Sequence, residues 1–371
     1  FFHFIAFLFS ALFLSLKDYN FVIINYHKVY SINLRVYPDI DIFENELIQK
    51  YDGVLEQLLR DHTTGQNIFW ATDNYELLGD HYSYYAQITK DLISGENGTV
   101  IMPRVKKDKQ LQQVRSRSMA EVFTPSWICN AQNNLIDAAW FGKKNVFNKE
   151  VIRKDGSKTW YVNREKITFP KDKTWRKYIL EKRLEIACGE APYITSRYDT
   201  TTGEFIPVEK RIGILDRKLR VINENVDNSG KWLLAAQDAY KSTYGFEWQG
   251  DSLLLAREAM LMTFIENYAL KFGKEPLPKS IKFIAYIISW NIWQMDGLKG
   301  IVPESCETTL KIGENLFGEK FTNKIECEGC QKNDLKKHNG IYCLINDWYS
   351  KDKSSGKKGL KIKFVDLLNK L

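Results

Sequence analysis

Two long apolar-rich stretches dominate the pattern of hydrophobic and polar positions. Residues 252–272 and 277–293 carry apolar side chains at helical spacing with few interruptions, which is typical of buried core helices. A shorter helical pattern covers 41–61, and another helix is expected over 173–182, leading directly into the next strand. A fifth follows Pro125, and its predicted buried side carries Ile128, Ala131, Leu135, Ala138 and Ala139.

Strand-like segments alternate with these helices. Residues 68–75 and 100–105 are predicted strands, and Asp155-Gly156 predicts the turn of a hairpin joining 151–152 to 160–162. After 184–186 the chain passes into small residues at 187–189, and Pro192 then suits the first turn of a helix. Strand, tight turn and helix is how an open α/β sheet forms a ligand crevice at the carboxyl ends of its strands. A polar loop is expected over 350–358, before a short amphipathic end at 362–371.

Composition adds only broad limits. The 371 residues are enough for two domains, or for one large α/β domain with insertions. A 44% apolar and 27% charged composition is that of a soluble globular protein. A net charge of +7 permits a nucleic-acid partner without requiring one. Six cysteines without a secretory pattern indicate a reducing compartment, and we therefore expect the cytoplasm.

The N-terminal segment, residues 1–40, is expected to lie outside the fold. Its first 16 residues are almost wholly apolar, and no methionine precedes Met102. A signal-peptide core and a short membrane span are alternatives, but a basic leading region is missing and the run is shorter than the roughly 20 residues of a usual span. We favour an upstream read or a truncated fragment, with a membrane anchor as the alternative.

A basic run lies between 104 and 117. Its members are Arg104, Lys106, Lys107, Lys109, Arg115 and Arg117. Such a run is either a solvated face or a set of phosphate contacts that would position DNA beside the ligand crevice without reading its sequence.

A cysteine-rich segment follows the second long helix. Cys327 and Cys330 are separated by two residues, and Cys306, His338 and Cys343 lie nearby in the sequence. Thiols at this spacing, with a further Cys or His, close tetrahedral zinc sites. We predict that Cys327, Cys330 and Cys343 bind zinc, with Cys306 or His338 as the fourth ligand. A redox Cys-x-x-Cys is disfavoured because no thioredoxin-like context surrounds the pair; unliganded structural cysteines are the remaining alternative.

Four segments in a fixed order resemble the cofactor-binding half of the gamma-class adenine-N6 DNA methyltransferases of restriction–modification systems. The segments are EVFTP at 121–125, LEIACGEAPY at 184–193, RIGILD at 211–216 and WQGDSLL at 248–254. The resemblance covers about 66–296. It implies a Rossmann-like S-adenosylmethionine-dependent methyltransferase sheet at 118–300, preceded by an N-terminal accessory region at 41–117. A Cys-rich insertion at 301–350 and a loop with a C-terminal segment at 351–371 would follow.

The resemblance also implies which residues bind the cofactor. Phe123, Thr124 and Pro125 would lie over its methionine part, and the turn of Ala187, Cys188 and Gly189 would approach it closely. Asp216, at the end of a second strand, would accept hydrogen bonds from the ribose hydroxyls. Asp251 would accept a hydrogen bond from the adenine amino group, and Leu253 would pack near the adenine ring. Glu185 and Glu190 lie where a carboxylate favours the cationic end of the ligand, and Ala191 departs from the common turn, which has a second glycine here.

No catalytic residue is predicted. The family makes adenine N6 nucleophilic with an Asn-Pro-Pro-Tyr-like segment that also stacks on the extruded base, and none of the nine prolines here adjoins another. We therefore expect a fragment that ends before the catalytic strand and does not methylate DNA alone. Its expected partners are double-stranded DNA and a restriction endonuclease subunit, with no membrane. The main alternative is a non-catalytic zinc- and nucleic-acid-binding module, and a weaker one is a methyltransferase acting on RNA or protein.

Overall fold

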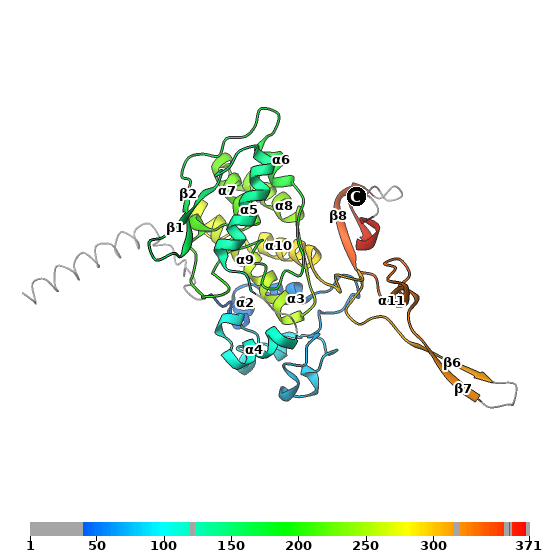
Figure 1. The fold of residues 1–371 in the computed structure, drawn as a ribbon. Helices are drawn as coiled ribbons and strands as arrows, with labels where there is room; N and C mark the ends of the chain where they lie inside the picture. Colours follow the sequence, from blue (N-terminus) through cyan, green and yellow to red (C-terminus); the bar gives the residue numbers. More distant parts are fainter. Residues whose placement is uncertain (1–39, 119–122, 315–319, 352–355, 357, 369–371) are drawn as a thin grey trace, which may run out of the picture.

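The computed structural model of the chain describes residues 40–118, 123–314, 320–351, 356 and 358–368, and most of its helices gather in one body (Figure 1). Its helices are α2 (Glu44–Lys50), α3 (Val54–Leu59), α4 (Lys109–Ser118), α5 (Ser126–Phe141), α6 (Trp175–Leu180), α7 (Ile214–Asn225), α8 (Ser229–Lys241), α9 (Gly250–Phe272), α10 (Pro278–Asn291) and α11 (Glu328–Lys332). Its strands are β1 (Asn148–Ile152), β2 (Lys158–Val162), β3 (Arg183–Glu185), β4 (Thr243–Glu247), β5 (Ile292–Gln294), β6 (Thr309–Glu314), β7 (Lys320–Ile325), β8 (Leu344–Lys351) and β9 (Lys358–Lys363). The hairpin of β6 and β7 projects from the body (Figure 1). Apart from residue 40, the expectation for 1–40 falls outside the described residues. Among the described helices, none has the length and hydropathy needed to cross a membrane.

A three-stranded parallel sheet lies at the centre, in the order β3-β4-β5. Helices α7 and α8 connect β3 to β4, and α9 and α10 connect β4 to β5. Parallel strands joined by helices have all their carboxyl ends at one edge, where open α/β sheets bind ligands. The predicted mixed α/β class is confirmed at this level.

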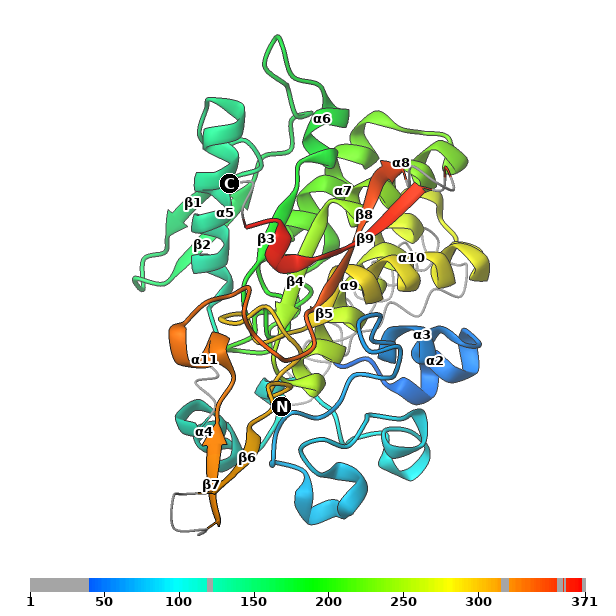
Figure 2. The ribbon, with the colours of Figure 1, turned by 90° about the vertical axis from the view of Figure 1, so that its right-hand side faces the viewer.

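Different elements pack against the two faces of the sheet. One face packs into the main core, where Cys188 and Ile292 lie among apolar residues of α7, α8, α9 and α10. The other face presents Phe246 and Trp293 to Ile345 and Phe364, which belong to β8 and to the turn after β9. Figure 2 shows the β8–β9 hairpin lying across the strands of the sheet. Both faces are therefore buried at β4 and β5, which is the usual state of a parallel sheet, whereas Leu184 of the edge strand β3 is exposed.

Several local predictions are confirmed. Helices α9 and α10 cover the two long apolar stretches, with Pro278 in the first turn of α10. Helix α5 starts directly after Pro125. The Thr174 side chain accepts a hydrogen bond from the Lys177 N–H and so caps α6 within the predicted 173–182. The β1–β2 hairpin turns at Gly156, whose φ of +83° favours glycine.

Other local predictions are wrong. The single helix predicted over 41–61 is two helices, because Gly53 adopts a left-handed φ of +70° between them. Residues 68–75 contribute one bridge, Phe69 to Gln87, and 100–105 runs into a short 3-10 turn, where strands were predicted. The amphipathic end expected over 362–371 is not contradicted: it begins within β9, which pairs with β8, and its residues 369–371 lie outside the described residues.

The buried side of α5 also differs from the prediction. Leu135 is 68% exposed, while Asn130 and Asp137 are buried. The reason is Arg217 of α7, whose guanidinium donates to the Asp137 carboxylate at 2.6 Å and to Asn130 Oδ1 at 2.9 Å. A buried ion pair thus orients the helix, a contact that hydropathy periodicity does not reveal.

Candidate cofactor and metal sites

A cavity of about 490 Å³ lies at the carboxyl ends of β3 and β4. Segments far apart in sequence line it: the Phe-Thr-Pro segment, one side of α5, the turn after β3, the start of α7 and the end of β4 with the start of α9. The lining residues are Phe123, Thr124, Gln132, Asn133, Ile136, Leu184, Glu185, Ile186, Ala187, Cys188, Gly189, Pro192, Tyr193, Ile214, Glu247, Gln249 and Ser252.

The turn after β3 has an unusual backbone. Ala187, Gly189 and Ala191 have φ values of +47°, +53° and +57°, in the left-handed region that L-residues with side chains avoid. The Cys188 N–H donates to the Phe246 carbonyl at 2.8 Å, which holds the turn against β4. Ala191 departs from the glycine of the resembling family at a position whose φ favours glycine. A Cβ added to Gly189 would meet no heavy atom within 4 Å, so this side of the turn is open.

Pro192 does not start a helix, contrary to the prediction. It lies in a turn that continues to Ile194, and α7 begins only at Ile214. The turn is closed by Glu185, whose carboxylate accepts hydrogen bonds from the N–H groups of Tyr193 at 3.3 Å and Ile194 at 3.0 Å. The side chain at the end of β3 therefore occupies the N–H groups that a helix start would present.

Two buried carboxyl groups line the cavity. Burial raises the pKa of Glu185 to about 8, even though it accepts two backbone hydrogen bonds. Burial also raises the pKa of Glu247, which accepts from the N–H groups of Gly189 at 2.8 Å and Gln249 at 3.3 Å. A cationic ligand beside such carboxyl groups would favour their charged form, which burial alone disfavours.

Asp216 does not end a strand, contrary to the prediction, and it does not line the cavity. It is buried in the first turn of α7, where its Oδ2 accepts from the Gly213 N–H at 3.1 Å and from the Ser196 N–H at 2.8 Å. Residues 211–216 instead form the entry to a helix. The residue that ends the strand beside β3 is Glu247. The sequence does contain a signal for Glu247, because it is an acidic residue at the end of a segment with aromatic side chains, 243–247.

Asp251, also predicted to bind cofactor, is fully buried behind the cavity wall. Its carboxylate accepts from Tyr75 Oη at 2.7 Å and lies 3.1 Å from Lys107 Nζ and 2.9 Å from Arg115. Burial opposes its charge, but the two cations hold its pKa far below the usual range. Its neighbours Gln249 and Ser252 line the cavity, whereas Asp251, Leu253 and Pro125 do not.

A second site lies at the base of the β6–β7 hairpin, with Cys306 preceding β6 and Cys327 following β7. The ligand atoms of Cys306, Cys327, Cys330 and His338 all lie within 4.8 Å of one another. The three Sγ atoms are 3.5, 3.6 and 3.6 Å from His338 Nδ1. Zinc–sulfur bonds of about 2.3 Å and zinc–nitrogen bonds of about 2.0–2.1 Å at a tetrahedral angle separate these atoms by about 3.5–3.6 Å. The four residues therefore form a group that can hold a metal ion.

Cys343 is not part of this group, contrary to the prediction. Its side chain is fully buried between the sheet and the β8–β9 hairpin, with Sγ 3.4 Å from the Gln294 carbonyl oxygen. His338 takes the fourth position. Burial alone would raise the pKa of Cys327, but hydrogen bonds from the N–H groups of Asn339 and Cys330 contribute to lowering it to about 6. Burial and the neighbouring thiols raise the pKa of Cys306 instead, so Cys327 is the thiol that more readily becomes the thiolate that a metal ion binds.

Comparison of the chain with protein-family models, with curated proteins and with solved structures finds no match. Function is therefore inferred from the geometry of these two sites and from the resemblance of the four segments.

Proposed function

We propose that the cavity at the ends of β3 and β4 binds S-adenosylmethionine, and that the chain belongs to an adenine-N6 DNA methyltransferase. One observation carries the proposal: Phe123 and Thr124 of the Phe-Thr-Pro segment, the left-handed turn and an acid ending the neighbouring strand all line one cavity. Its volume of about 490 Å³ lies within the roughly 300–1,000 Å³ of small-molecule sites.

Each wall has a role that matches the ligand. The Glu247 carboxylate at the end of β4 accepts hydrogen bonds from the ribose hydroxyls, as an acid does in dinucleotide folds. It takes the role that the resemblance gave to Asp216. Glu185 favours the cationic methionine end. The open side of Gly189 allows the backbone to approach the ligand closely. The bound donor supplies an electrophilic methyl group, and no residue of this chain is assigned to activating the adenine that receives it.

For the metal group we propose one zinc ion bound by Cys306, Cys327, Cys330 and His338. Four protein ligands close a tetrahedral shell, which is typical of structural rather than catalytic zinc. The ion would join the two ends of the β6–β7 hairpin to the segment before β8. Zinc binding here also supports the alternative function, a non-catalytic module that binds zinc and nucleic acid.

Calorimetry with S-adenosylmethionine separates the two functions. We expect the full chain to bind the donor, and Glu247→Gln to weaken binding roughly tenfold to a hundredfold, as expected for loss of a hydrogen bond to a charged group. Glu165→Ala removes an exposed glutamate away from the cavity and is the control. A well-folded wild type that does not bind the donor contradicts the methyltransferase proposal and leaves the zinc-binding module. Unchanged affinity in Glu247→Gln contradicts the ribose role.

A further inference from the structure

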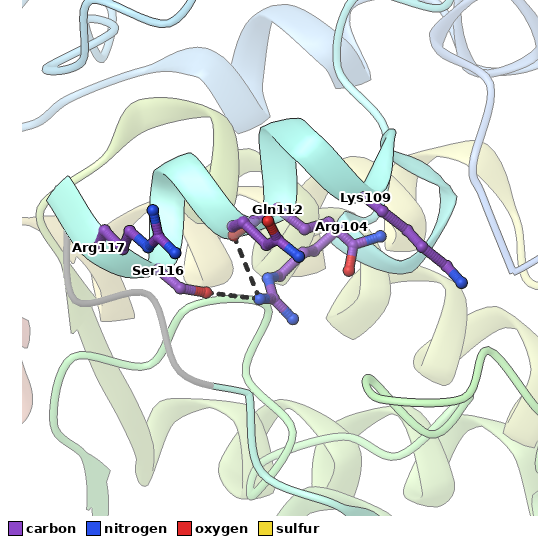
Figure 3. A pocket seen from close by; sticks show the side chains of 6 residues that line it. Arg104, Lys109, Gln112, Ser116 and Arg117 are labelled. Carbon is purple, nitrogen blue, oxygen red and sulfur yellow. Dashed lines mark hydrogen bonds between the residues drawn. The ribbon is translucent and has the colours of Figure 1, made fainter.

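A second cavity, of about 370 Å³, lies along one side of α4 (Figure 3). Its lining combines Arg104 with five residues of that helix, namely Lys109, Gln112, Gln113, Ser116 and Arg117. The helical residues stand at i, i+3, i+4, i+7 and i+8, so they share one face. The lining therefore holds three cations together with amide and hydroxyl groups, and none of its described residues is acidic.

The opposite face of α4 is anchored beside the proposed donor cavity. Arg115 is fully buried, pairs with Asp251 at 2.9 Å and donates to Gln249 Oε1 at 2.8 Å. Gln249 lines the donor cavity. The basic run is thus divided: Lys107 and Arg115 are structural partners of Asp251, whereas Lys109 and Arg117 are exposed.

Arg104 forms a second link between the two cavities. Its guanidinium donates to Ser116 Oγ at 2.7 Å and lies 4.9 Å from the ring centre of Phe123. Phe123 is part of the donor cavity wall. A cation–π contact and a side-chain hydrogen bond therefore hold one guanidinium at the border of the basic cavity and the donor cavity.

We propose that the α4 cavity binds a backbone phosphate of the nucleic acid whose base enters the donor cavity. The proposal rests on the proposed function. Guanidinium groups, an ammonium group and neutral hydrogen-bond donors are the groups that bind phosphate oxygens. A phosphate held there would place the strand without reading its sequence. The same side chains would also recognise free inorganic phosphate, and the experiment below distinguishes these two ligands.

The test measures binding of the full chain to a fluorescent 20-base-pair DNA duplex, by anisotropy over a series of salt concentrations. The double variant Lys109→Ala with Arg117→Ala should bind about tenfold more weakly, and the slope of log affinity against log salt should fall by roughly 1–2. Lys279→Ala, an exposed lysine at the start of α10, should match the wild type. Arg117→Lys should retain most of the affinity because it keeps the charge.

The outcomes distinguish this site from the donor cavity. Donor affinity, measured by calorimetry, should be the same in every variant. Equal DNA affinity and equal salt slope in the double variant and Lys279→Ala would overturn the proposal, as would a wild type that does not bind the duplex. Loss of inorganic phosphate binding with DNA affinity unchanged would assign the cavity to free phosphate and also overturn it. DNA binding that depends on Lys109 and Arg117 supports it, even if the wild type fails to bind the donor.

Discussion

Buried charges join segments that lie far apart in the sequence. Asp251 at the start of α9 pairs with Lys107 and Arg115, and Glu266 in the second half of α9 pairs with Arg197 and Arg211. Each pair lies in surroundings where removal of one partner leaves an uncompensated charge. The residues around Asp251 determine how α4 is held against the wall of the donor cavity.

Asp251→Ala should therefore destabilise the protein by about 3–5 kcal/mol, because Lys107 and Arg115 stay buried without their counter-charge. Urea unfolding measures the change. Asp227→Ala removes the exposed partner of Lys271 and should leave the midpoint unchanged. The lowered pKa of Asp251 means that its stabilising effect is present above the unfolded pKa of about 3.9 and lost as the pH falls further. A variant as stable as Asp227→Ala would show that the two cations do not need this carboxylate.

Glu185 should couple donor binding to pH. With its pKa raised to about 8, the carboxyl group of the protein without a ligand is mostly protonated at pH 7. A cationic ligand favours the charged form, so binding should release a proton, and affinity should rise between about pH 6 and pH 8. The unliganded fold should become less stable over the range from the unfolded pKa to about pH 8, because the unfolded chain ionises first.

Calorimetry at pH 7 in two buffers with different ionisation enthalpies counts the released protons. Glu185→Gln should abolish both the proton release and the pH dependence of affinity. Equal observed enthalpies in the two buffers for the wild type would contradict the coupling.

The β6–β7 hairpin is tied to the body at its base, where Cys306, Cys327, Cys330 and His338 meet. A two-stranded hairpin has little stability by itself. If a metal ion fixes its ends, the free energy of metal binding contributes directly to the folding of this element.

Elemental analysis of the purified chain should give about one zinc ion per molecule. Cys330→Ser should lose the ion because it removes one of the four ligands. Since Cys330 is exposed, its substitution disturbs little else. Cys343→Ala should keep it, because this thiol lies in the core away from the four ligands. A chelator should make residues 306–338 more sensitive to protease in the wild type. A protein that lacks zinc and has unaltered protease resistance would refute the site.

In the molecule as a whole, the sheet depends on the C-terminal hairpin to cover one face. Phe364 packs against Phe246 and Trp293, with ring centres 6.0 and 5.6 Å apart. Phe364, close to the last described residue, thus belongs to the same apolar cluster as the central strands β4 and β5. Its contribution is hydrophobic and non-local, so it depends on the hairpin being folded back over β4 and β5.

Phe364→Ala should cost about 3–5 kcal/mol, the usual range for removing a buried phenylalanine. The matched control is Leu368→Ala, because this nearby side chain is 41% exposed and should matter little. Denaturant unfolding gives the difference. A dye that binds exposed apolar surface should respond to the first variant and not to the second. Equal midpoints for both variants would show that the hairpin does not stabilise the sheet.

The sequence alone determined the elements whose signals are local. Apolar periodicity located α9 and α10, Pro125 marked the start of α5, and Asp155-Gly156 marked the β1–β2 turn. The Cys-x-x-Cys spacing identified Cys327 and Cys330 as members of a group that can hold a metal ion. These signals act within one or two turns of the chain, where backbone preferences and side-chain spacing are read directly.

Only the tertiary structure decided which distant residues meet. Asp216 and Glu247 both follow apolar segments, but the pairing of β4 beside β3 places Glu247 at the cavity and leaves Asp216 in a helix turn. Cys343 was predicted as a ligand, and His338 only as one of two alternatives for the fourth position, but the fold places Cys343 in the core against the sheet and His338 beside the three other thiols. The break at Gly53 and the buried polar side of α5 likewise follow from backbone conformation and an ion pair. Strand pairing and the meeting of distant side chains are set by contacts between segments, and local periodicity does not specify those contacts.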